Sequence, residues 1–321
     1  MQAAYVETPD PDDPLGALRV GDRPEPEPGP GWMTVEVRAA SLNHHDLFSL
    51  AGVGLRADRC PMILGCDAAG IDAAGNGVIV HGVINDPSWR GEETLDPKRT
   101  LLSEVHQGTF AQRVTVPLRN VVPKPAEISF AEGACLGVAW LTAYRMLFVK
   151  SGLRPGQTVL VQGASGGVAT AAIMLGRTGG FRVWVTGRTE AKRDAAVQLG
   201  AHAAFEPGAR LPERVDAVIE TVGAATWEHT LRSLRPGGTV VVAGTTTGPN
   251  PPAGLNRVFF LQLSVLGSTM GSRDELESLV GLLTTTGVRP VIDRVLPLAQ
   301  AAAGLAAMQA GETAGKIVFE P

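Results

Sequence analysis

The residues Gly163 to Ala169, Gly-Ala-Ser-Gly-Gly-Val-Ala, have the composition of a turn that binds phosphate. Small residues let the backbone bend sharply and approach a ligand, and the start of a helix offers amide groups to an anion. A strict G-x-G-x-x-G fingerprint requires glycine at Ala164 and Ala169; alanine is accepted at the last place, whereas the first is a departure. We interpret the turn as a site for the pyrophosphate of a dinucleotide, with an ordinary strand–helix turn as the alternative.

The segments on both sides of this turn are those that a dinucleotide site needs. Thr158 to Gln162 is a short apolar, β-rich run, Ala169 to Arg177 has the apolar spacing of a helix, and Phe181 to Thr186 is a second β-rich run. In this order they form a βαβ unit of a parallel sheet, which binds ligands at the carboxyl ends of its strands. The turn residues expected to contact the cofactor are Ala164, Ser165, Gly166, Gly167 and Val168.

The end of the second strand distinguishes the two nicotinamide dinucleotides. NAD-binding proteins place an acidic residue about 20 residues after the turn, where it binds the ribose 2′-hydroxyl. This chain has Gly187 and Arg188 there, with Lys192 one turn into the next helix. A guanidinium can bind a phosphate through two parallel hydrogen bonds, so these residues favour NADP(H). The alternative is that both cations are solvated charges at a helix start, where the helix dipole disfavours them unless an anion is near.

The composition is that of a globular protein long enough for two domains with apolar cores. The chain has 321 residues, of which 44% are hydrophobic. Its net charge of -4 argues against nucleic acid or an anionic membrane as a partner. No apolar stretch approaches the roughly 18 residues of a membrane span, and the first residues lack a leader pattern, so we expect a cytoplasmic protein. The three cysteines lack C-x-x-C spacing and suggest neither a disulfide framework nor a zinc knuckle.

The rest of the chain divides into a strand-rich part and an alternating part. Residues 1–120 contain β-like runs and a proline-rich loop, and helical patterns begin at Ser129. After Arg188, helices and strands alternate as in a continued parallel sheet, so the loops at the strand ends are expected to contact the dinucleotide. These loops contain Val222, Gly223, Gly244, Thr245 and Thr246. The apolar stretch Phe259 to Met270 predicts a strand that either lies at a sheet edge and pairs with a second subunit or is a buried final strand.

Seven short strings occur in an order and spacing that resemble those of a known family. They are Asn43-His44-His45-Asp46 with Gly52, Gly65-Cys66-Asp67-Ala68-Ala69-Gly70, Gly108-Thr109-Phe110-Ala111, Leu141-Thr142-Ala143-Tyr144, the turn at Gly163, Arg235-Pro236-Gly237-Gly238 and Gly315-Lys316-Ile317-Val318. Over nearly its whole length the chain resembles the medium-chain dehydrogenase/reductase superfamily, most of all its quinone oxidoreductase branch. The resemblance implies an α/β fold: a Rossmann domain with a doubly wound parallel sheet over residues 126–273, which binds NADP, and a GroES-like β-rich catalytic domain over residues 1–125 and 274–321.

The same resemblance predicts a protein without zinc. Alcohol dehydrogenases of this superfamily bind a catalytic zinc through a cysteine, a histidine and a second cysteine, which fall here at Asn43, at Cys66 and near Val138. Cys66 and Asp67 could bind a metal in principle, but a catalytic zinc needs about three protein ligands with correct geometry. The four-cysteine zinc lobe of those enzymes is also missing, because residues 86–99 contain no cysteine.

The resemblance also assigns residues to the substrate site. It places Asn43 by the nicotinamide, where its amide can hydrogen-bond a carbonyl, and Thr142 beside the nicotinamide ring. Phe48 falls where many quinone oxidoreductases have a tyrosine, so a polar anchor is lost. Trp140 could stack against a conjugated substrate or simply pack at a domain junction. His202 resembles a position near the adenosine phosphate, with an exposed loop histidine as the alternative.

His44 and His45 are the titratable side chains next to Asn43. Adjacent residues point in different directions, so one of the two is expected to face the substrate, where a histidine can donate or accept a proton near neutral pH. His45 joins Asn43 and Thr142 as a catalytic candidate, with a hydrogen-bonded structural histidine as the alternative. Cys66 is a substrate-binding candidate, although no adjacent base marks it as a nucleophile and a small buried residue is the alternative.

Together these features predict an NADPH-dependent, zinc-independent oxidoreductase that reduces quinones or α,β-unsaturated carbonyl compounds by hydride transfer. Such a site need only polarise the acceptor carbonyl and exclude water, since the proton can come from solvent. The expected partners are a small conjugated carbonyl or quinone substrate and a second copy of the chain in a homodimer, with no nucleic acid or membrane. A zinc-independent carbonyl or alcohol dehydrogenase and a non-catalytic NADPH-binding structural or regulatory protein are the alternatives.

Overall fold

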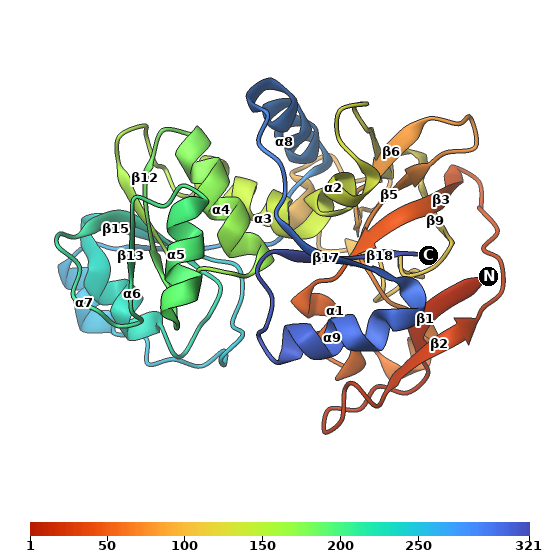
Figure 1. The fold of residues 1–321 in the computed structure, drawn as a ribbon, viewed down its shortest axis with the longest axis horizontal. Helices are drawn as coiled ribbons and strands as arrows, with labels where there is room; N and C mark the ends of the chain where they lie inside the picture. Colours follow the sequence, from red (N-terminus) through yellow and green to blue (C-terminus); the bar gives the residue numbers. More distant parts are fainter. The chain divides into compact units, whose positions relative to one another are not determined.

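The computed structural model describes all 321 residues and divides them into two compact units. Unit 1 contains both ends of the chain, Met1–Ala139 and Gly271–Pro321, and unit 2 is the segment Trp140–Met270 (Figure 1). The α/β fold class is confirmed, because unit 1 is rich in antiparallel strands and unit 2 has a parallel sheet covered by helices. None of the helices combines the length and the apolar composition that crossing a bilayer requires.

Unit 1 contains three sheets. The largest has the strand order β10-β6-β5-β3-β18-β17 with β9 also paired to β3, a second has the order β2-β1-β4, and β7 pairs with β8. The strands are β1 (Gln2–Val6), β2 (Leu18–Asp22), β3 (Trp32–Ser41), β4 (Met62–Ile63), β5 (Asp67–Ile71), β6 (Gly77–Val80), β7 (Val83–Ile84), β8 (Thr100–Leu101), β9 (Arg113–Pro117), β10 (Val121–Pro123), β17 (Ile292–Pro297) and β18 (Lys316–Glu320). The helices are α1 (His44–Leu50), α2 (Phe130–Ala134), α8 (Arg273–Thr286) and α9 (Ala301–Gln309), with short 3-10 turns η1 (Ala57–Arg59), η2 (Glu93–Leu95), η3 (Leu118–Asn120) and η6 (Leu298–Gln300).

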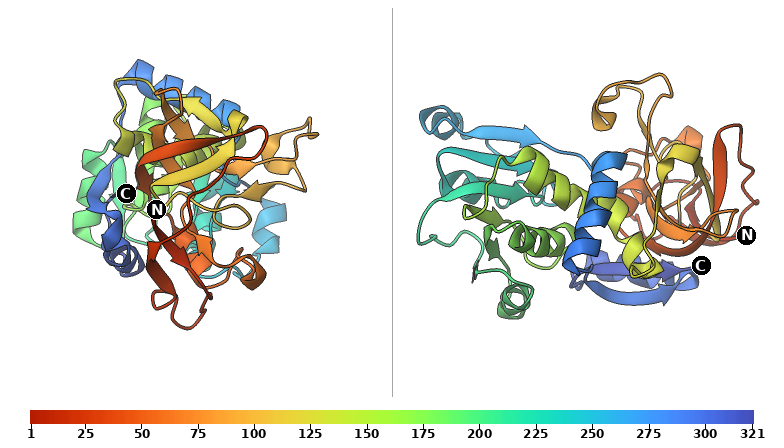
Figure 2. Two further views of the ribbon diagram at one scale, coloured as in Figure 1. Left: turned by 90° about the vertical axis from the view of Figure 1, so that its right-hand side faces the viewer. Right: turned by 90° about the horizontal axis from the view of Figure 1, so that it is seen from above.

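The C-terminal strand β18 completes the main sheet of unit 1. It pairs antiparallel with β3, with Val318 opposite Ser41, and parallel with β17. In Figure 2 the C-terminal segment, drawn in blue, accordingly lies beside strands of the N-terminal segment, drawn in red and orange. The first four residues of β18 are buried, which is what a strand enclosed by sheet neighbours and by α9 requires.

Unit 2 is a six-stranded parallel sheet with the order β13-β12-β11-β14-β15-β16. Its strands are β11 (Thr158–Val161), β12 (Arg182–Thr186), β13 (Ala203–Phe205), β14 (Val215–Glu220), β15 (Leu234–Val242) and β16 (Ser264–Gly267). Its helices are α3 (Leu141–Tyr144), α4 (Gly167–Thr178), α5 (Glu190–Gln198), α6 (Trp227–Ser233) and α7 (Leu255–Phe260), with π-helical turns η4 (Leu136–Trp140), which crosses the division, and η5 (Arg145–Lys150). The first strand lies in the middle, so the order reverses between β11 and β14, as in a doubly wound Rossmann sheet.

Two further details are the position where the units divide and the place of the apolar stretch that begins at Phe259. The first division between the units falls after Ala139, later than the expected position at residue 126, because α2 packs on β3 and β5 of unit 1. The apolar stretch from Phe259 is only partly a strand: Phe259 and Phe260 end α7, and β16 begins at Ser264. All four residues of β16 are exposed at the edge of the sheet, so the strand is not a buried final strand, and its pairing with a second subunit stays a prediction.

Candidate functional site

The dinucleotide turn lies between β11 and α4, at the carboxyl end of the central strand of unit 2. Gly163 has a φ of +97°, which favours glycine, and a Cβ added at Gly163 or Gly166 would meet no atom within 4 Å. Helix α4 begins directly behind the turn, and the first amide groups of a helix have no intrahelical acceptor. The turn therefore combines open space with amide donors, which is the arrangement that binds a pyrophosphate. All five predicted contact residues, Ala164, Ser165, Gly166, Gly167 and Val168, lie in this turn or at the start of α4.

The predicted 2′-phosphate residues lie together after β12. A Cβ at Gly187 would come within 2.9 Å of Arg193 Cγ and 3.1 Å of Ala164 Cβ, so an acidic side chain does not fit there without rearrangement. Burial and the charge of Arg188 lower the pKa of Lys192. Two cations held this close are stabilised by an anion between them. Arg193 is a residue that the sequence reading missed: its Nη1 donates to the carbonyl of Gly187 at 2.9 Å and fixes the loop.

The remaining predicted cofactor loops follow β14 and β15 and are bonded to one another. Thr247 donates its backbone N–H to the carbonyl of Val222 at 2.8 Å, and Thr246 donates to Thr221 at 3.4 Å. Gly223 has a φ of +92°, and a Cβ there would lie 2.6 Å from the carbonyl oxygen of Gly248. The structure thus brings Val222, Gly223, Gly244, Thr245 and Thr246 to the same edge of the sheet as the turn at Gly163.

His202 is set apart from these loops. It precedes β13, and its Nδ1 accepts the backbone N–H of Val183 near the start of β12, at the amino end of the strands. The adenosine contact expected of it would have to come from the opposite edge of the sheet. Thr142 and Trp140 lie in the helical segment before β11 and are buried, and the Trp140 Nε1 has no hydrogen-bond partner.

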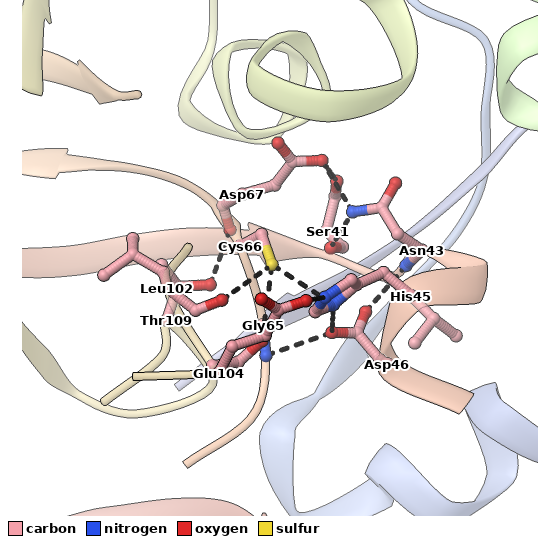
Figure 3. A network of polar contacts seen from close by, with 12 residues as sticks. Ser41, Asn43, His45, Asp46, Gly65, Cys66, Asp67, Leu102, Glu104 and Thr109 are labelled. Carbon is pink, nitrogen blue, oxygen red and sulfur yellow. Dashed lines mark hydrogen bonds and ion pairs between the residues drawn. The ribbon is translucent and has the colours of Figure 1, made fainter. Parts of the chain in front are cut away.

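Asn43 lies in unit 1, at the junction of β3 and α1, where it caps the helix. Its backbone N–H donates to Asp46 Oδ2 at 2.8 Å. Its side-chain Nδ2 donates to the carbonyl of Ser41 at 3.2 Å and to Asp67 Oδ2 at 2.8 Å (Figure 3). Its Oδ1 accepts from Lys316 Nζ at 2.5 Å. Every hydrogen of the amide is therefore already engaged within unit 1.

Lys316 is the main site residue that the sequence reading did not single out. Its side chain is 3% exposed, and its Nζ also donates to the carbonyl of Leu42 and lies 3.6 Å from Asp67 Oδ2. Burial raises the pKa of Asp67, and the neighbouring ammonium opposes this effect. The only sequence signal for Lys316 is its place in the Gly315-Lys316 string near the C-terminus.

His45 forms a second polar cluster with Cys66 and Glu104 (Figure 3). Its Nε2 lies 2.9 Å from Glu104 Oε1 and its Nδ1 lies 3.4 Å from Cys66 Sγ, which also donates to the carbonyl of Leu102 at 3.2 Å. Burial acts to lower the pKa of His45, but its neighbours raise that pKa well above the ordinary value. The neighbours that raise the pKa of His45 are first the Cys66 sulfur and then Asp46 and Glu104, whereas burial raises the pKa of Cys66 and His45 opposes that effect. The ring of His45 therefore contacts a carboxylate through Nε2 and a sulfur through Nδ1.

The side chains around this cluster differ in access. His44 and Phe48 lie on the exposed side of α1, whereas the side chain of His45 is 20% exposed and Cys66 is buried. His45, Asp46 and Cys66 could together hold a metal ion, because one ligand atom of each lies within 4.8 Å of the other two. Asp46 Oδ1 already accepts the backbone N–H of Gly65 at 3.1 Å. Glu104 follows β8, and nothing in the sequence around it indicated a place beside His45.

Two family descriptions match the chain, one within unit 1 and the other mostly within unit 2. "Alcohol dehydrogenase GroES-like domain" matches residues 29–126, and "Zinc-binding dehydrogenase" matches residues 167–285. A "Zinc-type alcohol dehydrogenase-like protein YogA" from Leptosphaeria maculans is 30% identical over 333 aligned positions, which cover 92% of each chain. A "Quinone oxidoreductase" from Lama guanicoe is 28% identical and covers 86% of this chain and 84% of its own.

A solved structure supports the same assignment for the fold. The structure described as an NAD-dependent alcohol dehydrogenase is 32% identical, covers 100% of both chains and superposes with a TM-score of 0.92. The similarity therefore extends over both units. The chain belongs to the medium-chain dehydrogenase/reductase superfamily, in its quinone oxidoreductase-like branch, and is an oxidoreductase.

Proposed function

We propose that the protein is an NADPH-dependent, zinc-independent reductase of quinones or α,β-unsaturated carbonyl compounds. The observation that carries this proposal is the buried ammonium of Lys316, which is hydrogen-bonded to Asn43 Oδ1 at a position where zinc enzymes of the superfamily have a ligand. The relative described as a quinone oxidoreductase supports the acceptor class.

The preference for NADPH rests on the loop after β12. Gly187 has no room for the acidic side chain that would bind a ribose 2′-hydroxyl, because the stem of Arg193 and Ala164 occupy the space. Arg188 is exposed, and Lys192 lies near it. Burial and the charge of Arg188 lower the pKa of Lys192. A dianionic phosphate bound there would relieve the repulsion between the two cations. The structural neighbour described as NAD-dependent makes this preference the first point to measure.

The family's zinc positions do not fit a metal in this chain. Asn43 offers only an amide oxygen, and that oxygen is bound by Lys316, whose positive charge would repel a divalent cation. Asp67 lies 3.6 Å from the same ammonium and is its counter-charge. A buried ammonium therefore occupies the polar position that a metal would need.

A site without a bound metal is limited in the reactions that it can perform. Oxidising an unactivated alcohol removes a proton from a group with a pKa of about 16, which a bound zinc makes easier by lowering that pKa. A quinone or conjugated carbonyl instead gains negative charge on its oxygen when it accepts a hydride. Such an oxygen needs only a preorganised donor and a source of protons.

We assign the donor to His45. A bound nicotinamide supplies the hydride. Glu104 holds the His45 ring through Nε2 at 2.9 Å, and the shortest contact of Nδ1 in the cluster is the long one to Cys66 Sγ at 3.4 Å, so Nδ1 is the ring atom that can leave its partner, stabilise an oxyanion and deliver a proton to it. The expected direct hydrogen bond from Asn43 to the carbonyl would require one of its two internal bonds to break, so we propose that Asn43 orients its neighbours and lines the site. Thr142, Phe48, Cys66 and Trp140 remain proposed site residues.

A metal-dependent alcohol dehydrogenase is the second candidate. It is favoured by the grouping of His45 Nδ1, Asp46 Oδ1 and Cys66 Sγ within 4.8 Å of one another. Against it, burial raises the pKa of the Cys66 thiol, so a metal would have to displace the thiol proton to gain a thiolate ligand, and Asp46 Oδ1 already accepts the backbone N–H of Gly65.

The test compares acceptors with and without a chelator on purified protein. We expect NADPH to be oxidised by p-quinones or enones far faster than NADP is reduced by simple alcohols, with no stoichiometric zinc by elemental analysis. Cys66→Ser should leave the metal content and the chelator resistance unchanged, as should the matched variant Cys60→Ser. About one zinc per chain, with activity lost when it is removed, would establish the second candidate instead.

We also propose that two copies of the chain form a dimer through β16. This strand is the exposed edge of the parallel sheet, and apolar side chains beside it are exposed as well: Val265, Leu266, Leu255, Phe259 and Phe260. An exposed apolar edge pairs readily with an identical edge related by a twofold axis.

A further inference from the structure

A chain of buried polar side chains crosses the centre of unit 2, and Gln162 is its middle member. Gln162 follows β11 and is 1% exposed. Its Oε1 accepts from Thr186 Oγ1 at 2.7 Å, and its Nε2 lies 3.0 Å from both Thr230 Oγ1 and His229 Nδ1. The hydrogen-bonding groups of one amide are thus directed at three side chains on two elements, β12 and α6.

The partners of Gln162 allow only one arrangement of donors and acceptors. The amide nitrogen of Gln162 can only donate, so His229 Nδ1 accepts. The other ring nitrogen of His229, Nε2, then carries the hydrogen and donates to the carbonyl of Ala209 at 2.8 Å. Burial lowers the pKa of His229, which agrees with this neutral ring. The orientation of the Gln162 amide is therefore fixed from both ends.

The same network continues to three loops at the carboxyl edge of the sheet. Thr186 Oγ1 accepts the backbone N–H of Gly163, the first residue of the dinucleotide turn, at 3.2 Å. Thr186 itself immediately precedes Gly187 and Arg188. On the other side, Thr230 Oγ1 donates to Glu220 Oε2 at 2.6 Å, and Glu220 Oε1 accepts the backbone N–H groups of Val222 at 2.7 Å and Gly223 at 3.0 Å.

We propose that Gln162 is a positioning residue for the dinucleotide: through Thr186 and Glu220 it holds the turn at Gly163, the loop at Arg188 and the loop at Val222 at fixed separations. This inference rests on the proposed NADPH site. A dinucleotide contacts these loops at points far apart on one molecule, so its affinity depends on their mutual spacing as well as on each contact. Buried hydrogen bonds are directional and costly to leave unmade, which makes them suited to fixing that spacing.

The test uses variants that keep the shape and remove the hydrogen bonds. Gln162→Met keeps the length of the side chain, Thr186→Val keeps its branching, and Thr186→Ser restores the hydroxyl. Ser151→Ala is the matched control, because Ser151 is a buried hydroxyl of the same unit whose bonds reach only Leu147 and Leu153. Dissociation constants for NADPH and NADH are measured by titration, and stability is measured by denaturant unfolding.

We expect Gln162→Met and Thr186→Val to weaken the binding of NADPH by about tenfold or more and to reduce the preference for NADPH over NADH. Thr186→Ser should recover the affinity, and Ser151→Ala should lose stability without losing affinity. A double variant, Gln162→Met with Arg188→Ala, should weaken NADPH binding by less than the product of the single effects. The reason is that an Arg188 already displaced by Gln162→Met contributes less to NADPH binding. For NADH the two effects should multiply.

The outcomes separate this inference from the proposed function. If the wild type prefers NADPH and both single variants keep that affinity and preference, or if the double variant shows simple multiplication for NADPH, the positioning function of Gln162 is overturned and the cofactor assignment stands. If the wild type prefers NADH, the cofactor assignment fails, while a loss of NADH affinity in Gln162→Met and Thr186→Val would still support the positioning function.

Discussion

At the scale of single residues, Lys316 determines how Asn43 can act. An ammonium can only donate hydrogen bonds, so the oxygen of the Asn43 amide must face it and the nitrogen must face Asp67. The three groups satisfy one another in a place where water is excluded, and removing one would leave a buried charge without compensation. Asn43 is consequently a fixed part of the site with no spare N–H for a substrate oxygen. Of the two histidines that follow Asn43, His45 is the one whose ring is held by a carboxylate.

The cofactor preference is also a property of single residues. Arg188→Ala should weaken NADPH about tenfold to a hundredfold, since a charge-assisted hydrogen bond contributes about 1.5 to 3 kcal/mol. NADH, which lacks the 2′-phosphate, should bind nearly as before. The measurement is a fluorescence titration of both cofactors, with Arg154→Ala as the control, because Arg154 precedes β11 at the amino end of the strands. Equal NADH and NADPH affinities in the wild type would contradict the assignment.

At the scale of elements, local patterns in the sequence were sufficient to predict the βαβ unit that carries the proposed dinucleotide site and insufficient for the cluster around Asn43. The turn at Gly163 and the Gly187-Arg188 pair lie within one βαβ unit, where strand, turn and helix follow one another along the chain. His45 and Glu104 are 59 residues apart, and Asn43 and Lys316 are 273 apart. Their contacts depend on which strands become neighbours, β18 beside β3 above all, and no local periodicity encodes that pairing.

The Gln162 network also could not be predicted from local patterns in the sequence. The polar residues of the network are isolated in the sequence, and each one alone is compatible with a buried strand or helix position. Only the parallel pairing of β11 with β12 and β14 brings Thr186 and Glu220 to either side of Gln162. The loops that we propose to contact a cofactor could thus be located from the sequence, whereas the residues that hold these loops could not.

The edge strand β16 supports a prediction at the same scale. Val265→Lys should convert the proposed dimer into a monomer, because a lysine at the edge places two like charges across a twofold-related pairing. Val265 is 46% exposed, and Val197 on α5 is 47% exposed, so Val197→Lys is a matched control that should leave the assembly unchanged. Light scattering at micromolar concentration measures the mass of each protein. A wild-type monomer, or a dimer that survives Val265→Lys, would show that β16 is not the interface.

At the scale of the whole molecule, the two units differ in how the chain builds them. Unit 2 is one continuous segment, whereas unit 1 needs both ends of the chain, and β18 joins them. Phe319 on β18 is fully buried, and its ring lies 5.1 Å from that of Phe110 in an edge-to-face contact at 88°. Helix α9 packs directly on it, since a Cβ at Gly304 would come within 2.7 Å of Phe319 Cζ.

Phe319→Ala should therefore destabilise unit 1 alone. Removing a buried phenylalanine costs about 3 to 5 kcal/mol, because the transfer free energy is lost and the cavity only partly closes. Chains of this size commonly unfold in more than one step. Circular dichroism in increasing denaturant should therefore show the unfolding transition of unit 1 at a lower denaturant concentration than in the wild type. At denaturant concentrations below that transition, the affinity for NADPH should be unchanged, because it depends on the loops of unit 2.

Leu160→Ala on the buried strand β11 is the reciprocal variant and should lower both the stability of unit 2 and the affinity for NADPH. If Phe319→Ala instead weakened cofactor binding and shifted all unfolding equally, the two units would have to fold as one.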